Sequence, residues 1–244
     1  MNFFFFTLLL FASFAGAEPK VIHIFTALCD NEHQGIVKVP AKIGDGNKPA
    51  ENLYWGAMYG IKTWFLKNES WEKTADWKVS ETVLERLVFK RKGKEVYLVA
   101  DAYRGKNMKE CLNAYFASLA GEFQKDEALT KLGISLKQTS LSIFVGHNGL
   151  MDFKMPFVKG NGKIDAMSFC CKSKAFFEEG IKAAGSRPVL LTNGFMAPEA
   201  YSVSAAIDGW LLGNTPEGIA RRAAAAYNQF QKCGHKGAYN LFKP

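Results

Sequence analysis

The sequence has few of the spacings by which common metal and catalytic sites are recognised. Its four histidines and five cysteines form no C-x-x-C or H-x-x-x-H pair, which disfavours a zinc site. No G-x-S-x-G segment is present, which argues against a serine hydrolase with a nucleophile elbow. We therefore expect no cofactor and no metal, and the weakest alternative is a metal site built from cysteines together with His23, His33, His147 and His235.

Charged side chains are missing from the first 17 residues, MNFFFFTLLLFASFAGA. This apolar run ends in Ala15-Gly16-Ala17, the small-x-small pattern at which a signal peptidase cleaves. The run is too short for a stable membrane span of about 20 residues. The sequence thus predicts a cleaved signal peptide at residues 1–17 and one domain over residues 18–244. The product would be exported, either periplasmic or secreted, with no membrane attachment after cleavage.

The sequence has few cysteines, and their number is odd. Five cysteines in an exported chain leave at least one thiol free or paired between chains. Cys170 and Cys171 are adjacent and poorly placed to bond each other. Cys29, Cys111 and Cys233 are the candidates for one disulfide, and the sequence does not choose among them.

Positive charge exceeds negative charge, with 31 Lys and Arg against 23 Asp and Glu and a net charge of +8. The cations are nevertheless scattered, and the one dense run, KRKGK at residues 90–94, has the glycine of a hairpin tip. We interpret these side chains as solvated surface and expect no nucleic-acid partner.

Apolar and β-branched runs alternate with helical periodicity along the chain, which predicts an α/β fold with a mainly parallel sheet and helices on both faces. Residues 84–100 are expected to form an antiparallel hairpin. Trp71 and Trp77 are expected in a less regular connection. The predicted strands are residues 21–28, 84–89, 96–100, 141–145, 164–169 and 188–191, and the predicted helices begin after Asn52, at Met108, after Cys171 and after Thr215.

Polar side chains follow five of these predicted strands. They are Asp30, Asp101, His147, Cys171 and Asn193. Because binding sites in open α/β sheets form at the carboxyl ends of the strands, we expect these residues to converge on one edge. Cys171 would also stand just before a helix, whose N-terminal N–H groups favour a thiolate. Cys170 would point into the core.

Two short motifs resemble the caspase-like superfamily of cysteine peptidases, which includes caspases, metacaspases and gingipains. Val145-Gly146-His147-Asn148-Gly149 looks like the family's His-bearing turn, and Phe169-Cys170-Cys171-Lys172-Ser173 looks like its Cys-bearing strand end. The resemblance implies a caspase-like sandwich, with Cys171 as nucleophile. It also implies an oxyanion hole made by the N–H of Cys171 with that of Asn148 or Gly149.

The sequence departs from the family pattern in two respects. Asn148 stands where the family has glycine, which puts the oxyanion hole in question. Residues 150–163, between the two motifs, are short for a helical crossover and have no clear helical pattern, so we expect an irregular connection.

The expected chemistry is acyl transfer by a Cys171–His147 dyad on a protein or peptide substrate. Asp152 either orients the imidazole or is a solvated turn residue. Asp30, Asp101 and Glu199 are candidates for an acidic pocket that selects Lys or Arg side chains. The alternative is a catalytically inactive caspase-like domain that uses the same cleft as a binding or interaction module.

Overall fold

The computed structural model describes residues 19–244, so the expected signal peptide and its cleavage site lie outside the described residues. The described chain folds around one sheet with the strand order β2-β3-β4-β1-β5-β6-β7. Strands β4, β1, β5, β6 and β7 pair in parallel, and β2, β3 and β4 pair antiparallel. The predicted α/β class with a mainly parallel sheet is confirmed. The strands are β1 (Lys20–Ala27), β2 (Trp71–Trp77), β3 (Val83–Arg91), β4 (Val96–Tyr103), β5 (Thr139–Val145), β6 (Asp165–Phe169) and β7 (Arg187–Leu190).

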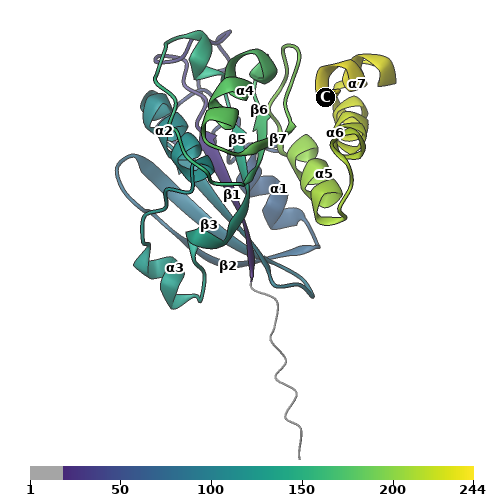
Figure 1. The fold of residues 1–244 in the computed structure, drawn as a ribbon. Helices are drawn as coiled ribbons and strands as arrows, with labels where there is room; N and C mark the ends of the chain where they lie inside the picture. The colour runs from purple at the N-terminus through teal and green to yellow at the C-terminus, as the bar shows by residue number, and fades with distance from the viewer. Residues whose placement is uncertain (1–18) are drawn as a thin grey trace, which may run out of the picture.

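Helices cover both faces of the sheet (Figure 1). Phe25 and Ala27 of β1 pack in a cluster with α2 and α4, whereas Ile22 and Ile24 belong to the cluster that includes α1, α5, α6 and α7. Alternate residues of a strand point to opposite faces, so β1 contributes to two cores and reads as a continuous apolar run. The helices are α1 (Ile61–Lys67), α2 (Met108–Leu119), α3 (Glu127–Lys131), α4 (Ser173–Ala183), α5 (Ala200–Leu211), α6 (Pro216–Gln231) and α7 (His235–Phe242).

The expected hairpin at residues 84–100 is present as β3 and β4, which pair antiparallel. Its tip carries the basic run, and Gly93 adopts φ +70°, a conformation that side chains with a Cβ rarely tolerate. The pairing continues beyond the hairpin, because Trp71 and Trp77 begin and end the edge strand β2. The expectation of an irregular connection there was wrong.

The predicted start of the helix after Asn52 was also wrong. The first helical residue is Ile61, and residues 53–60 form turns. Asn52 instead turns its buried amide towards the loop after β1, where it accepts from Cys29 N over 2.9 Å and donates to Cys29 O over 2.8 Å. Asn52, a residue type that often caps helices, therefore holds a long loop against the end of β1 instead.

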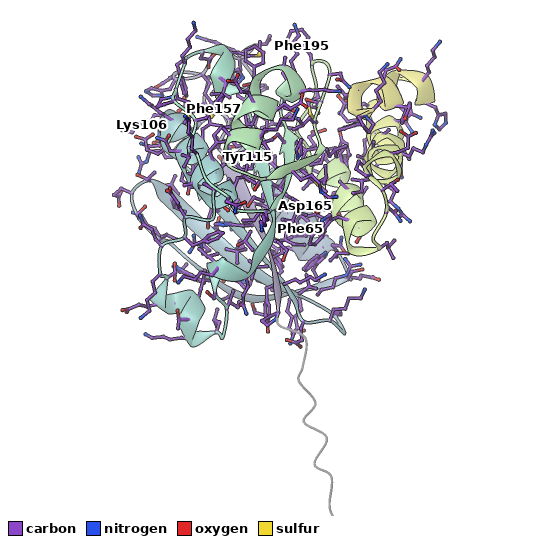
Figure 2. All side chains as sticks on the ribbon, viewed as in Figure 1. Phe65, Lys106, Tyr115, Phe157, Asp165 and Phe195 are labelled. Atoms are coloured by element: carbon purple, nitrogen blue, oxygen red, sulfur yellow. The ribbon has the colours of Figure 1, made fainter. Side chains whose placement is uncertain are left out.

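The connection from β5 to β6 is irregular, as predicted, apart from one short turn at Gly149–Met151. Its apolar side chains take the place of a crossover helix. Phe157 packs on Phe116 of α2 with ring centroids 5.1 Å apart (Figure 2). The backbone then follows the end of α4, with Gly160 N–H bonded to Ala183 O over 3.1 Å.

The disulfide expectation is contradicted, because all five cysteines are free. Among the three candidates, Cys29 and Cys111 are buried and Cys233 is exposed. Cys29 follows β1 and Cys111 lies on the core face of α2, so burial rather than a covalent bond accounts for both of them. Within residues 19–244, no helix is both long and apolar enough to cross a membrane.

Candidate active site

His147 and Cys171 stand at equivalent positions just beyond the ends of the neighbouring strands β5 and β6. Val145 of β5 lies opposite Phe169 of β6 in the parallel pairing, and each candidate residue lies two positions further along the chain. Gly146, between Val145 and His147, adopts φ +149°, and a Cβ there would lie 2.9 Å from the carbonyl oxygen of Ala27. The turn can therefore pass close over the end of β1 only with glycine at this position.

The imidazole of His147 is held by Asp152. Nε2 lies 2.7 Å from Asp152 Oδ2, and the same oxygen accepts the backbone N–H of Gly35 over 3.0 Å. Of the two readings of Asp152, the structure favours the orienting carboxylate. Gly35 belongs to the loop after β1 and Asp152 to the loop after β5. The hydrogen bond from Gly35 to Asp152 thus joins these two loops. After β1 the chain continues to the β4 side of the sheet and after β5 to the β6 side, so the bond lies at a topological switch point.

The remaining ring nitrogen of His147, Nδ1, forms no hydrogen bond with any residue in the described range. Because Asp152 occupies Nε2, Nδ1 is the nitrogen that could exchange a proton with a thiol or a leaving group. His147 and Cys171 are not hydrogen-bonded to each other among these residues.

The thiol of Cys171 contacts a backbone segment instead. Sγ accepts the N–H of Met196 over 3.4 Å and lies 3.6 Å from the carbonyl oxygen of the same residue. An N–H donor stabilises a thiolate, whereas a carbonyl acceptor stabilises a thiol. Met196 therefore offers a partner to both protonation states of the sulfur.

The chain bends sharply immediately after Cys171. Lys172 has φ +51° and ψ +35°, a left-handed conformation that is uncommon for a residue other than glycine. Its N–H is bonded to Gly194 O over 2.8 Å, and α4 begins at the next residue. Strained backbone beside a reactive side chain is frequent at functional sites, and here it turns Cys171 out of the strand just before a helix N-terminus.

The two adjacent thiols have different environments. Cys170 is fully buried, and burial first, then the neighbouring Cys171, raise the pKa of its thiol well above the usual value. Cys171 is partly exposed. Both residues lie beyond the end of β6 at Phe169, so the turn before α4, and not the alternation of strand side chains expected from the sequence, separates the two thiols.

The expected oxyanion donors are only partly available. The N–H of Gly149, which the sequence offers as an oxyanion donor, is hydrogen-bonded to His147 O over 3.1 Å. The side chain of Asn148 is also engaged, because Nδ2 donates to Cys171 O over 2.6 Å and Oδ1 accepts from Leu150 N over 3.1 Å. The backbone N–H groups of Asn148 and Cys171 form no hydrogen bond within the described chain, and these two remain as candidate donors.

The three acidic residues expected to line one pocket lie in separate hydrogen-bond networks. Asp101 was wrongly placed at a strand end, because β4 continues to Tyr103 and the Asp101 carboxylate is fully buried against Arg86 and His23. The Asp30 carboxylate is 4% exposed and accepts from the backbone of Glu32 and His33 and from the His33 ring.

Glu199 lies three residues after Met196 and precedes α5. Its Oε2 is bonded to the Tyr201 hydroxyl and to Gln231 Nε2. Asn193, the fifth strand-end residue, donates to the carbonyls of Asn240 and Lys243 and so fastens the C-terminal segment. None of these four side chains is hydrogen-bonded to Cys171 or His147.

Two contributors to the site have no signal in the sequence. Met196 reaches the thiol through its backbone, which any residue could supply. Thr192 holds the start of α4 by accepting from Ser173 N over 3.1 Å. The loop containing both was recognisable from Gly194 and Pro198, but neither role depends on a motif.

The site has the elements of an imidazole and thiol pair, but no metal centre of the usual kind. Within residues 19–244, no group of three or more His, Cys, Asp and Glu side chains could hold a metal ion. The caspase-like resemblance rests on two short turns and on the order of the elements that carry them. In comparisons with known proteins, no family model, curated protein or solved structure matches the chain.

Proposed function

We propose that this protein is an exported cysteine peptidase, or a related acyl-transfer hydrolase, that uses Cys171 and His147. The observation that carries the proposal is the hydrogen bond that His147 Nε2 donates to the Asp152 carboxylate, at the sheet edge where Cys171 is partly exposed. A carboxylate that fixes one imidazole nitrogen leaves the other for proton transfer, which is the arrangement that an activated thiol requires.

In the proposed reaction, His147 Nδ1 takes the proton of the Cys171 thiol and the thiolate attacks the carbonyl carbon of a peptide. The backbone N–H groups of Asn148 and Cys171 bind the developing oxyanion. His147 then gives its proton to the leaving amine, and the C–N bond breaks. Water, deprotonated by the same imidazole, hydrolyses the thioester and restores the thiol.

The loop of residues 192–199 would act as the cover of the thiol. Cys171 Sγ now contacts Met196 N and O, so substrate entry would exchange these contacts for the substrate carbonyl and the imidazole. Phe195, in the same loop, is 68% exposed, and its ring lies 4.5 Å from Lys172 Nζ (Figure 2). Catalytic hydrogen bonds are often long in free enzymes and tighten when substrate binds.

The contacts of Cys171 with Met196 favour a second function. Because Cys171 is hydrogen-bonded to the Met196 backbone and not to His147, the same strand-end surface would serve in an inactive binding module of the caspase-like type. The two functions differ in one property, the reactivity of the Cys171 thiol towards a peptide electrophile.

The test uses residues 18–244 and a set of peptidyl acyloxymethyl ketones that differ in the side chain before the reactive carbonyl. We expect one adduct per chain, located at Cys171 by mass spectrometry, with hydrolysis of the matching peptide amide. Cys171→Ser and His147→Ala should abolish both, and Cys170→Ala should retain both. Binding of the peptides without adduct or hydrolysis would support the binding module instead.

A further inference from the structure

A cavity of about 600 Å³ lies on the α2 face of the sheet, away from the candidate active site. Its floor is formed by β1, β3 and β4, and its walls by the end of α2 and residues 122–126. His147, Asp152 and Cys171 do not line it. The proposed peptidase reaction therefore makes no use of this space.

Buried charged side chains form the floor of the cavity. Arg86 donates from Nε and Nη2 to the two oxygens of Asp101, each over 2.6 Å, and from Nη1 to Asp126. His23 Nε2 lies 2.9 Å from Asp101 Oδ2. Arg86 is 6% exposed and Asp101 is fully buried, so this network is held in a largely dry environment.

The charges in this cavity do not balance. Lys125 and Glu122 are exposed and carry opposite charges, whereas among the less exposed groups one cation, Arg86, faces two carboxylates, Asp101 and Asp126. Burial disfavours the Asp101 carboxylate, but the charge and hydrogen bonds of Arg86 outweigh it and hold the pKa of Asp101 well below its usual range. An excess of one negative charge remains although the whole chain carries a net charge of +8. An uncompensated charge in a low-dielectric site is costly and favours a cation.

His23 adds an unused hydrogen-bond acceptor. Burial lowers its pKa despite the neighbouring Asp101, so the ring is neutral and Nε2–H donates to Asp101. Nδ1 is then an acceptor, and it is buried without a partner although His23 lines the cavity and is only 3% exposed. A buried acceptor without a donor is unfavourable, and a bound N–H group would remove this penalty.

Apart from Ser118 and Gln124, the rest of the lining is apolar or aromatic, with Phe25, Val83, Tyr103 and Phe123 around the charged floor. A fully charged, strongly hydrated ion such as a metal would leave these surfaces without a partner. Cavities with apolar walls and a few convergent polar groups are typical of sites for small organic molecules.

We propose that this cavity binds a small organic monocation, an ammonium group on an aromatic or apolar body. The ammonium would lie beside Asp126 and the Asp101–His23 pair, and the body would pack against Phe25 and Phe123. The ligand would thus supply the positive charge and the N–H donors that the buried network lacks.

The experiment is calorimetric titration of residues 18–244 with phenethylammonium, and with neutral 2-phenylethanol and anionic 3-phenylpropanoate as probes of similar shape. We expect the cation to bind at one site at least tenfold more tightly than either other probe. Asp126→Asn should weaken binding of the cation about tenfold, because it removes one charge while keeping the side-chain oxygen that caps Leu129 N.

Two further variants keep the proposal falsifiable if Asp126→Asn does not fold. Asp76→Asn removes an exposed acid of β2 that is paired with Lys73, and should leave binding unchanged. Ala114→Phe should fill part of the cavity and block the cation. Equal or tighter binding of 2-phenylethanol, unchanged binding of the cation in Ala114→Phe, or no saturable binding up to about 10 mM would each overturn the proposal.

Discussion

Asn148 donates its side-chain amide to the carbonyl oxygen of Cys171 over 2.6 Å. This bond ties the turn after β5 to the turn after β6 and so fixes the relative position of the imidazole and the thiol. The residue that departs from the caspase-like pattern is thus one that holds the two motifs together. Glycine at this position would provide the backbone N–H but no side-chain hydrogen bond between the two turns.

Replacing Asn148 by Ala should disturb both stability and reactivity. The change leaves the Cys171 carbonyl and the Leu150 N–H without their partner, so we expect a loss of about 1–3 kcal/mol in the free energy of unfolding. Alkylation of Cys171 should slow, because the two turns are no longer joined. Urea unfolding and iodoacetamide kinetics measure the two effects. Asn161→Ala, at an exposed site, should change neither quantity. If Asn148→Ala keeps the stability and the alkylation rate of the original protein, the hydrogen bond between the two turns contributes to neither.

Phe116 is fully buried on the core face of α2 and packs at tilted or edge-on angles against Tyr115, Phe157 and Phe177. Truncation to Ala removes a large side chain and leaves a cavity, so Phe116→Ala should lower the free energy of unfolding by about 3–5 kcal/mol. Asn113→Ala, on the exposed face of the same helix, should stay within about 0.5 kcal/mol of the unaltered protein. Similar denaturation midpoints for the two variants would contradict the face assignment.

The pH dependence of stability should depend on His23. Burial lowers its pKa in the folded state, whereas the unfolded chain binds a proton near pH 6.5. Between these two values the unfolded state binds more protons, so the free energy of unfolding falls as the pH decreases below about 6.5. His23→Gln should flatten this slope, and His235→Gln, at an exposed histidine, should preserve it. Chemical denaturation at several pH values measures the slope, and an equal slope in His23→Gln would exclude this role.

The five free thiols should divide into two classes. Cys171 and Cys233 are accessible, whereas Cys29, Cys111 and Cys170 are buried and burial raises the pKa of each. A thiol-exchange reagent should therefore titrate two thiols in the native protein and five after unfolding. Cys170→Ala should leave the native count at two and cost about 1–2 kcal/mol of stability. A native count of five would mean that the core opens readily, and a count below two would indicate a disulfide.

Strand positions were largely predictable from the sequence because they depend on short local runs of apolar residues. The apolar runs that became β1, β5 and β6 are buried on both faces, and a run of β-branched and aromatic residues has few other stable fates. The helix from Met108 to Leu119 was likewise readable, since its buried residues recur at helical spacing. Asp101 was misplaced because Ala102 and Tyr103 after it continue the strand, and no turn residue marks Asp101 as an end.

Hydrogen-bond partners were much harder to predict than strand ends. Asn52 has the residue type of a helix cap, and only the folded loop reveals that Cys29 competes for its amide. The bond from Gly35 to Asp152 and the contact of Met196 with Cys171 involve backbone groups, which leave no trace in residue type. The hydrogen bond from Gly149 N to the carbonyl of His147, two residues earlier, likewise involves backbone groups alone.

The proposed mechanism requires that His147, fixed by Asp152, activates the thiol of Cys171. The most direct measurement is the rate of Cys171 alkylation by iodoacetamide at pH 6, followed by mass spectrometry in a Cys233→Ala background. An ordinary thiol is almost fully protonated at that pH and reacts slowly. We expect a rate about tenfold or more above that of free cysteine; His147→Ala should remove this enhancement and Asp152→Asn should reduce it. A rate equal to that of free cysteine, or one that His147→Ala leaves unchanged, would contradict the proposed mechanism.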